Sequence, residues 1–335
     1  MFLEKYKINR DKMKILITGA AGYLGSQLTS YMLLKGHQIR AFDNMYYGGE
    51  SLLFGINNKN LEIVRGDVRN EEQLNKAMES VDCVIHLAGI VGEPACNLDK
   101  SFAWEINHDA AIKLVDLVGQ NNIKKMVFIS TCSNYGVSKP NELVDENSQL
   151  NPLSDYAKAK VAVEKYIMNS SKVSYSILRL GTLCGLSARM RFDLMINEIG
   201  AAIALDKEID IYTPQSWRPY VTVNDAAVAI EKIVGANENL VNKNIFNIVS
   251  CNLQKLQIVE MVLKNFPQAK IKITDKAPDL RDYKVNGDKF TNIFGKFDEK
   301  AIENTFLKVV NSVKNQYFYD SQSAIHTATS YKKIN

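Results

Sequence analysis

The chain has 335 residues, of which 46% are hydrophobic and 23% are charged, and this composition suffices for one large or two modest globular domains. Its 41 Lys and Arg against 37 Asp and Glu leave a formal charge of +4, which is too balanced to indicate nucleic-acid binding. The five cysteines are scattered and form no CxxC pair, which argues against a disulfide framework or a structural zinc site, so we expect no metal and a cytoplasmic location.

From Met13 to about Leu180, strand-like and helix-like segments alternate along the sequence. The expected strands are far shorter than the roughly 20 apolar residues of a membrane span. They are Lys14–Thr18, Gln38–Asp43, Leu61–Gly66, Cys83–Ala88, Lys125–Ser130 and Tyr175–Leu180. Amphipathic runs between them predict helices at Tyr23–Leu34, Glu71–Met78, Asp99–Gln120 and Tyr156–Asn169. Such alternation predicts an α/β fold with right-handed βαβ units and a doubly wound parallel sheet over residues 13–180.

The regular alternation of strand-like and helix-like segments ends after Gly181. Short strands are expected among helices, at Ile209–Thr213, Tyr220–Val223, Ile245–Val249 and Ile271–Thr274. They predict a smaller C-terminal α/β substrate-binding region over residues 181–318, with some elements crossing back to the sheet. The final stretch, Asp320–Asn335, is polar, so we expect residues 319–335 to form a fraying tail. The charged N-terminus lacks the apolar segment of a secretion signal.

The segment Lys14–Gly25, KILITGAAGYLG, joins a short apolar strand to the first turns of a helix through three glycines. The turn needs glycine because a Cβ would hold a phosphate away from the backbone N–H groups. A helix N-terminus adds unpaired donors and the positive end of its dipole. We therefore expect a pyrophosphate to bind at Gly19, Gly22, Tyr23, Leu24 and Gly25.

Asp43, followed by Asn44, ends the second expected strand, where a dinucleotide site needs an acid for the ribose 2′-hydroxyl. A carboxylate there would repel the 2′-phosphate of NADP. Arg40 lies nearby but has the opposite phase along the strand. These residues favour NAD over NADP.

The next two strand ends are also candidate cofactor contacts. Asp67, followed by Val68, either accepts a hydrogen bond from the adenine amino group or is the N-cap of the helix that starts near Asn70. The fourth strand ends in HLAG, and we interpret His86, which lies within this apolar strand, as structural. The residues after it would let the cofactor lie against the backbone; they are Leu87, Ala88 and Gly89.

The fifth strand runs into a hydroxyl-rich segment, residues 130–136, STCSNYG, at the strand end where this architecture binds ligands. Thr131 is expected to bind a substrate hydroxyl. Downstream, Tyr156 and Lys160 are four residues apart and share one helix face. A phenol has a pKa near 10, but a lysine ammonium and a nicotinamide cation nearby favour the phenolate. Tyr156 could then remove a proton from a sugar hydroxyl as hydride leaves the carbon beneath it.

These motifs, in this order and spacing, resemble the extended short-chain dehydrogenase/reductases that act on nucleotide sugars. The resemblance rests on TGAAGYLG, AFDN, GDV, HLAG, STCSNYG and YAKAK, and continues through WRPYVTVND at residues 217–225. It implies a Rossmann domain and tightly held NAD. It also implies that Tyr156 is the acid/base, that Lys160 lowers the pKa of Tyr156 and holds the nicotinamide ribose, and that Thr131 orients the substrate. Asn107 matches a position that is often structural or solvent-relaying.

For a nucleotide-diphosphate sugar substrate, the resemblance points to Arg218, in WRPYVTVND, and Arg281, in PDLRDY, because a guanidinium fork suits phosphate oxygens. Arg189 and Arg191, in SARMRFD, stand at an expected helix start and are further candidates. The sugar ring is expected beside the loop after the fourth strand and beside the fifth strand end. The residues assigned to it are Glu93, Cys96, Ser133 and Asn134.

Members of this family catalyse three kinds of reaction, which fit the motifs of this chain to different degrees. The 4,6-dehydratases carry Asp-Glu directly after the catalytic threonine, whereas this chain has Cys132-Ser133. The 4-epimerases need only Thr, Tyr and Lys, although they usually carry an asparagine where this chain reads LRLGTLCG. Net oxidation or reduction at C4 is favoured by a similarity of LAGIVGEPAC, GLSARMRFDLMIN and PDLRDYKVN to a bacterial branch that contains GDP-heptose 4-dehydrogenases of capsule pathways.

We therefore expect oxidoreduction at C4 of a nucleotide sugar in bacterial surface-polysaccharide synthesis, by a 4-epimerase or a 4-dehydrogenase/reductase. A non-catalytic NAD-binding sensor or scaffold typically lacks the Tyr or the Lys, and both are present here. Relatives pair the helices at residues 99–120 and 156–169 into an intersubunit four-helix bundle, which implies a homodimer. The apolar stripe on the first helix would also suit an internal contact with the sheet; it consists of Ile106, Ala110, Leu114 and Leu117.

Overall fold

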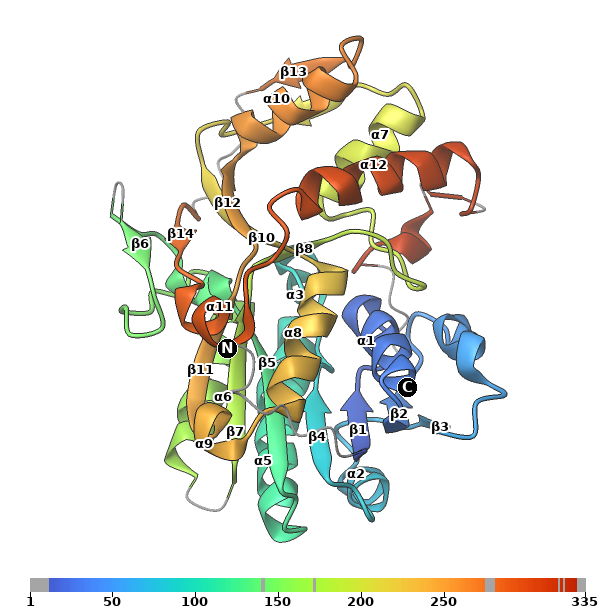
Figure 1. Cartoon of the computed structure of the whole chain (residues 1–335), viewed down its shortest axis with the longest axis vertical. Helices are drawn as coiled ribbons and strands as arrows, with labels where there is room; N and C mark the ends of the chain where they lie inside the picture. The colour runs from blue at the N-terminus through green and yellow to red at the C-terminus, as the bar shows by residue number, and fades with distance from the viewer. Residues whose placement is uncertain are drawn as a thin grey trace, which may run out of the picture.

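The centre of the molecule is a parallel sheet of seven strands in the order β11-β7-β5-β4-β1-β2-β3 (Figure 1). The structure is a computed structural model that describes residues 12–139, 142–170, 173–274, 281–318, 320–321 and 323–329. The strands are β1 (Lys14–Thr18), β2 (Gln38–Asp43), β3 (Leu61–Arg65), β4 (Cys83–His86), β5 (Lys125–Thr131), β7 (Tyr175–Leu180) and β11 (Asn244–Ile248). The six strands predicted before residue 181 are confirmed, and β11 joins the sheet edge beside β7 from the C-terminal region.

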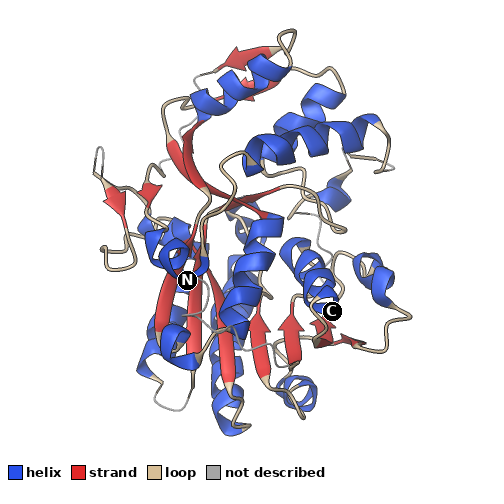
Figure 2. Ribbon diagram, viewed as in Figure 1, coloured by secondary structure: helices blue, strands red, loops and turns tan. Residues whose placement is uncertain are grey.

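Helices cover both faces of this sheet (Figure 2). Ile15 and Ile17 pack into one core cluster with α1 (Tyr23–Leu34) and α8 (Val223–Gly235), whereas Leu16 packs into the other. The second cluster includes α2 (Glu71–Ala77), α5 (Ala110–Gln120) and α6 (Asp155–Asn169). Burial on both faces explains why the inner strand β1 is apolar from Ile15 to Ile17. None of the helices in the described ranges is long and apolar enough to cross a bilayer.

The helical run predicted at Asp99–Gln120 is not one regular helix. It consists of α4 (Lys100–Trp104), a π-helical turn η2 (Glu105–Asp109) and α5. The wide turn carries Asn107, whose Oδ1 accepts from Ile90 N and whose Nδ2 donates to Ile90 O, both at 2.9 Å. A single helix was therefore the wrong prediction here, and the turn serves to clamp the loop after β4.

A smaller region lies at the carboxyl ends of the strands (Figure 1). It contains α7 (Met195–Ala204) packed against α12 (Ala301–Lys314), and a sheet of β12 (Cys251–Gln254), β10 (Trp217–Thr222) and β8 (Thr182–Cys184). Beyond these lie α10 (Lys255–Asn265) and the strand pair β9 (Ile209–Ile211) and β13 (Ile271–Ile273). The shorter elements are η1 (Glu50–Gly55), α3 (Glu93–Leu98), η3 (Cys132–Tyr135), β6 (Leu143–Val144), α9 (Glu238–Val241), β14 (Lys284–Val285), α11 (Asp288–Phe294) and η4 (Ala324–His326).

The described part of the C-terminal segment, residues 320–321 and 323–329, is docked on the protein. Phe192 N donates to His326 O at 2.9 Å, and Ala328 N donates to Asp193 Oδ2 at 3.1 Å. Ala328 is only 3% exposed. In Figure 1 the red chain after α12 runs down toward α1. The predicted fraying is therefore wrong for these residues, because their backbone groups pair with residues far earlier in the chain.

Candidate active site

A cavity lies at the carboxyl ends of the sheet strands, where doubly wound folds bind their ligands. One side is formed by the glycine loop and by the ends of β2, β4 and β5. The other side comes from residues beyond Leu180, which are Gly181, Thr182, Leu183, Arg189, Arg191, Leu194, Arg281 and Ala328. The cavity therefore joins the two parts of the chain.

The glycine loop approaches the loop after β4 so closely that no side chain fits between them. Gly19 has a φ of +74°, and a Cβ added to it would lie 2.7 Å from Ala88 N. A Cβ on Gly25 would lie 2.0 Å from Gly19 O. Gly22, Tyr23 and Leu24 line the cavity beside them, and α1 begins at Tyr23 without a side-chain cap. This backbone cradle at a helix N-terminus fits the diphosphate of a dinucleotide.

Asp43 is held at the cavity wall by backbone donors. Its Oδ2 accepts from Ala21 N at 3.0 Å and its Oδ1 from Met45 N at 2.8 Å. Burial raises the pKa of this carboxyl, and the two backbone hydrogen bonds and the charge of Arg189 act in the opposite direction. The other predicted cofactor contacts that line the cavity are Asn44, Val68, Leu87, Ala88 and Gly89.

Asp67 is engaged by a neighbouring arginine. Its Oδ2 pairs with Arg69 Nη2 at 2.7 Å, and it is not among the described residues that line the cavity. The N-cap of α2 is Asn70, whose side chain accepts from Gln73 N. Asp67 as the helix cap was therefore wrong, and its contact with adenine stays a prediction. His86 is structural, since it is fully buried and its Nδ1 lies 2.7 Å from Thr18 Oγ1.

The three predicted catalytic residues, Thr131, Tyr156 and Lys160, line the same cavity. Lys160 Nζ donates to Ile129 O at 2.9 Å and lies 5.9 Å from the Tyr156 ring centroid. Burial lowers the pKa of Lys160 to about 8, which leaves the ammonium the main form at neutral pH. Burial raises the pKa of Tyr156, and the Cys96 thiol raises it further while the Arg191 charge lowers it. Ionisation of the phenol therefore depends on nearby positive charge.

Successive residues of the turn after β5 lie alternately at the cavity wall and in the protein interior. Thr131 Oγ1 accepts from Ser133 N at 3.1 Å, and both residues line the cavity. Cys132 Sγ donates to Arg179 O, and Asn134 is fully buried, with its Nδ2 donating to Ser130 Oγ at 3.1 Å. The predicted contact of Asn134 with substrate is therefore wrong, because η3 directs this amide into the interior.

A buried ion pair lies behind the catalytic strand end. Arg179 Nη2 and Glu164 Oε2 are 2.6 Å apart, and their side chains are 3% and 0% exposed. Glu164 also accepts from Ser130 Oγ and from Asn134 Nδ2. This network joins α6, β5, β7 and η3, and it fixes the residue that precedes Thr131.

The loop after β4 contributes only one of its two predicted contacts. Glu93, the first residue of α3, lines the cavity. Cys96 is 3% exposed, its Sγ donates to Ile90 O at 3.3 Å, and it is absent from the described cavity wall. Burial raises the pKa of this thiol to about 11. The prediction that Cys96 binds the sugar is therefore wrong, because the helical turn of α3 carries it inward.

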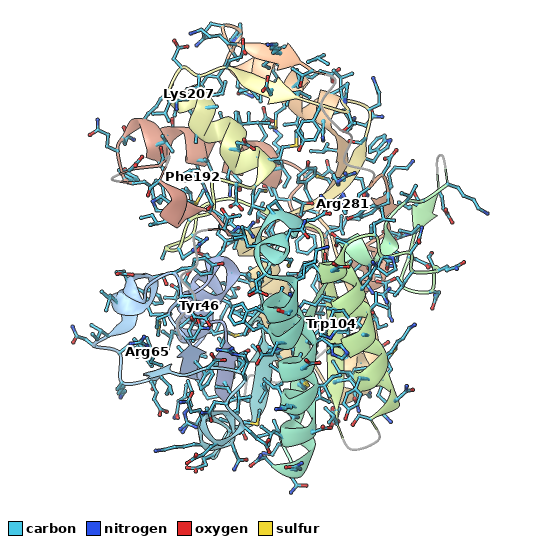
Figure 3. The ribbon with its side chains drawn as sticks, turned by 180° about the vertical axis from the view of Figure 1, so that it is seen from behind. Tyr46, Arg65, Trp104, Phe192, Lys207 and Arg281 are labelled. Atoms are coloured by element: carbon cyan, nitrogen blue, oxygen red, sulfur yellow. The ribbon has the colours of Figure 1, made fainter. Side chains whose placement is uncertain are left out.

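The four arginines predicted to bind substrate do not all line the cavity. Arg281 lines the cavity at the junction of the two regions (Figure 3). Arg191 also lines the cavity and is paired with Asp193 at 2.7 Å. Arg218 is buried, donates to Trp217 O at 2.7 Å and lies 5.8 Å from the Tyr283 ring. Arg218 is not among the described residues that line the cavity, and its contact with the substrate phosphate stays a prediction.

Arg189 reaches the cavity on the cofactor side. Its guanidinium lies 4.0 Å from the Tyr47 ring centroid and close enough to Asp43 to lower the pKa of that carboxyl. Its contact with the substrate stays a prediction, and its position beside Asp43 places it near the residues expected to bind the adenosine ribose.

The sequence interpretation missed several cavity residues, among them Tyr46, Tyr47, Ser154, Thr182 and Ala328. Two signals could have found some of them. Thr182 lies two residues after the end of β7, and Tyr46 and Tyr47 lie shortly after the strand-end acid Asp43. Ala328 carries no signal, because it is an alanine in a polar segment.

The glycine cradle, Asp43 and the Tyr156–Lys160 pair on a seven-stranded parallel sheet define an NAD-binding α/β protein of Rossmann type. The chain matches the NAD dependent epimerase/dehydratase family over residues 15–249 and belongs to that family. The resemblance stated from the motifs is thereby confirmed.

Relatives are found along most of the chain. A UDP-glucose 4-epimerase of Lactobacillus helveticus is 24% identical and covers 75% of this chain and 81% of its own length. A putative UDP-glucose 4-epimerase of Methanocaldococcus jannaschii is 26% identical, over 90% of this chain and 98% of its own.

Solved structures confirm the predicted Rossmann fold. The UDP-N-acetylglucosamine 4-epimerase of Methanobrevibacter ruminantium has a TM-score of 0.80 at 23% identity and covers 91% of this chain and 99% of its own. The UDP-glucuronic acid 4-epimerase of Bacillus cereus, in complex with UDP-glucuronic acid and NAD, has a TM-score of 0.80 at 21% identity, over 91% and 100% of the two chains. Its cofactor agrees with the cofactor of the family, and the prediction of NAD is confirmed.

Proposed function

We propose that this protein catalyses oxidation and reduction at C4 of a nucleotide-diphosphate hexose, as a 4-epimerase or a 4-dehydrogenase/reductase of bacterial surface-polysaccharide synthesis. The observation that carries the proposal is that Thr131, Tyr156 and Lys160 line one cavity together with the glycine cradle and Arg281. Cofactor cradle, proton-transfer group and phosphate-binding cation are thereby within reach of one extended substrate.

In this mechanism Tyr156 accepts the proton of the C4 hydroxyl, and bound NAD supplies the hydride acceptor. Lys160 keeps a positive charge beside the phenol, which favours the phenolate that burial alone disfavours. Thr131 orients the substrate hydroxyl toward Tyr156. The guanidinium of Arg281 binds the diphosphate, with Arg191 as a second cation on the same wall.

A 4,6-dehydratase is disfavoured by the geometry of the turn after Thr131. The position where the resemblance places an acid in dehydratases is Cys132, whose thiol is buried and donates to Arg179 O. Burial also raises the pKa of this thiol, so it is a poor acid for C5–C6 chemistry. A non-catalytic sensor is disfavoured because Tyr156 and Lys160 both line the cavity.

The proposal is tested by incubating the purified protein and NAD with UDP-, GDP-, dTDP- and CDP-hexoses. A 4-epimerase converts one of them to its C4 epimer, seen by NMR, without net NADH. A 4-dehydrogenase instead accumulates NADH, seen by absorbance, and a C4 ketone. The matching hexose 1-phosphates, which lack the nucleotide, should not be turned over. Binding of NAD without turnover of any nucleotide sugar would contradict an enzymatic role.

A homodimer through the outer faces of α4, α5 and α6 is part of the proposal. Trp104 is 39% exposed on this face, where it stacks on His108, and Met168 is 42% exposed (Figure 3). The stripe expected to support the dimer does not contribute, because it is buried against the sheet; it consists of Ile106, Ala110, Leu114 and Leu117.

Light scattering is expected to give twice the chain mass of 37.7 kDa for the wild type and a shift toward the monomer for Trp104→Glu. The physical reason is that a carboxylate placed in an apolar contact must be desolvated without a partner. A wild-type mass of one chain would contradict the dimer.

A further inference from the structure

Arg189 is a buried cation at the wall of the cofactor cavity. It is 7% exposed and lines the cavity together with Gly22 and Asp43. Its Nη1 donates to Met190 O at 3.2 Å and its Nη2 to Thr327 O at 2.7 Å. Its Nε finds no hydrogen-bond acceptor among the residues that the structure describes. A buried guanidinium N–H without an acceptor is costly, and an anionic ligand would satisfy it.

The loop that carries Arg189 is fixed across the first turn of α1. Ser187 Oγ donates to Tyr23 O at 2.6 Å and lies 2.9 Å from Ser26 Oγ. Tyr23 in turn donates its hydroxyl to Gly185 O at 2.6 Å. These contacts hold the loop against the helix whose N-terminus forms the phosphate cradle. Arg189, two residues after Ser187, is therefore held on the cradle side of the cavity.

The C-terminal segment 323–329 closes the same end of the cavity. Tyr47 donates its hydroxyl to Ala328 O at 2.9 Å, and Asp193 accepts from Ala328 N. Together with the bond from Arg189 to Thr327 O, these contacts seat Ala328 in the cavity wall near Asp43. The family match ends at residue 249, so this wall belongs to a part of the chain outside it.

We propose that Arg189 binds the diphosphate of the dinucleotide together with the glycine cradle, and that the C-terminal segment 323–329 retains the dinucleotide by covering its adenosine end. The glycine cradle fits a diphosphate, and Arg189 is a buried cation whose Nε–H could donate a hydrogen bond to that anion. Release of the cofactor then requires the bonds to Thr327 and Ala328 to open.

The diphosphate contact is tested by calorimetric binding of ADP and of adenosine to the wild type, Arg189→Gln and Arg189→Lys. Loss of a charge-assisted hydrogen bond is expected to weaken ADP binding by about 10- to 100-fold. Adenosine binding should change by less than about threefold, because a neutral ligand makes no such bond. Arg189→Lys should restore part of the ADP affinity. An equal loss for ADP and adenosine would overturn the assignment.

Retention is tested by the rate at which NADH, followed by its fluorescence, leaves the protein on dilution. A chain ending at Phe318 is expected to release NADH at least about tenfold faster than a chain ending at Thr329, which keeps every contact named above. Tyr47→Phe, which removes one hydrogen bond to Ala328 O, should accelerate release several-fold. The Tyr47→Phe variant still tests the retaining role if the chain ending at Phe318 does not fold. Release at the wild-type rate from Tyr47→Phe and from any folded short chain would overturn the retaining role.

Discussion

Replacement of Tyr156 by phenylalanine is expected to lower turnover of the nucleotide sugar by about 10³-fold or more while NAD binding is retained. In the proposed mechanism the phenolic oxygen takes the substrate proton, and phenylalanine fills the same space without it. Lys160 keeps its bond to Ile129 O and Gly19 keeps its cradle, so the cofactor contacts survive. Steady-state kinetics and NADH titration measure the two effects separately.

The matched control is Tyr166→Phe, a tyrosine-to-phenylalanine change on the same helix. The Tyr166 hydroxyl donates to Asp116 at 2.6 Å on the surface, away from the cavity. Its loss should leave turnover within about twofold of the wild type, because an exposed hydrogen bond contributes little. Near-normal turnover in Tyr156→Phe would contradict the acid/base assignment.

Replacement of Glu164 by leucine is expected to lower the free energy of unfolding by about 3–5 kcal/mol, measured by urea denaturation. The change leaves Arg179 charged and buried without its carboxylate, and removes the acceptor of Ser130 and Asn134. Since Ser130 precedes Thr131, the same variant should also lose turnover even where it is folded.

Two comparisons separate burial from ion pairing. The double variant Glu164→Leu with Arg179→Leu should recover much of the lost stability, because no unpaired buried charge remains. Lys270→Met breaks an exposed pair of similar length, 2.7 Å to Asp206, and should cost less than about 1 kcal/mol. A cost for Glu164→Leu no larger than that of Lys270→Met would contradict the role of the buried network.

Local pattern was sufficient to predict the strands, the cofactor and the shared position of Tyr156 and Lys160 at one cavity. Each strand of a parallel sheet is buried on both faces, so an apolar run such as Lys14–Thr18 carries its own signature. The glycine loop requires a positive φ at Gly19, and a glycine at that position in the sequence already indicates such a conformation. Tyr156 and Lys160 share a helix face by their spacing alone. Family, fold and NAD could therefore be predicted without tertiary contacts.

The direction of individual side chains at the site was decided by contacts between distant segments. Cys96 and Asn134 turn inward because Ile90, Ser130 and Glu164 offer them buried partners. Sequence spacing could not show this, since it depends on where each strand ends and each turn begins.

The placement of Arg189 and of the C-terminal segment was settled in the same way. Arg189 lies beside Asp43 because Ser187 bonds to Tyr23, which is 164 residues earlier in the chain. Ala328 closes the cofactor cavity because Tyr47 and Asp193 pair with its backbone. Short-range patterns in the sequence indicate which face of a helix or strand is buried. Only the tertiary structure shows which distant segment covers that face and which ligand the two segments can bind together.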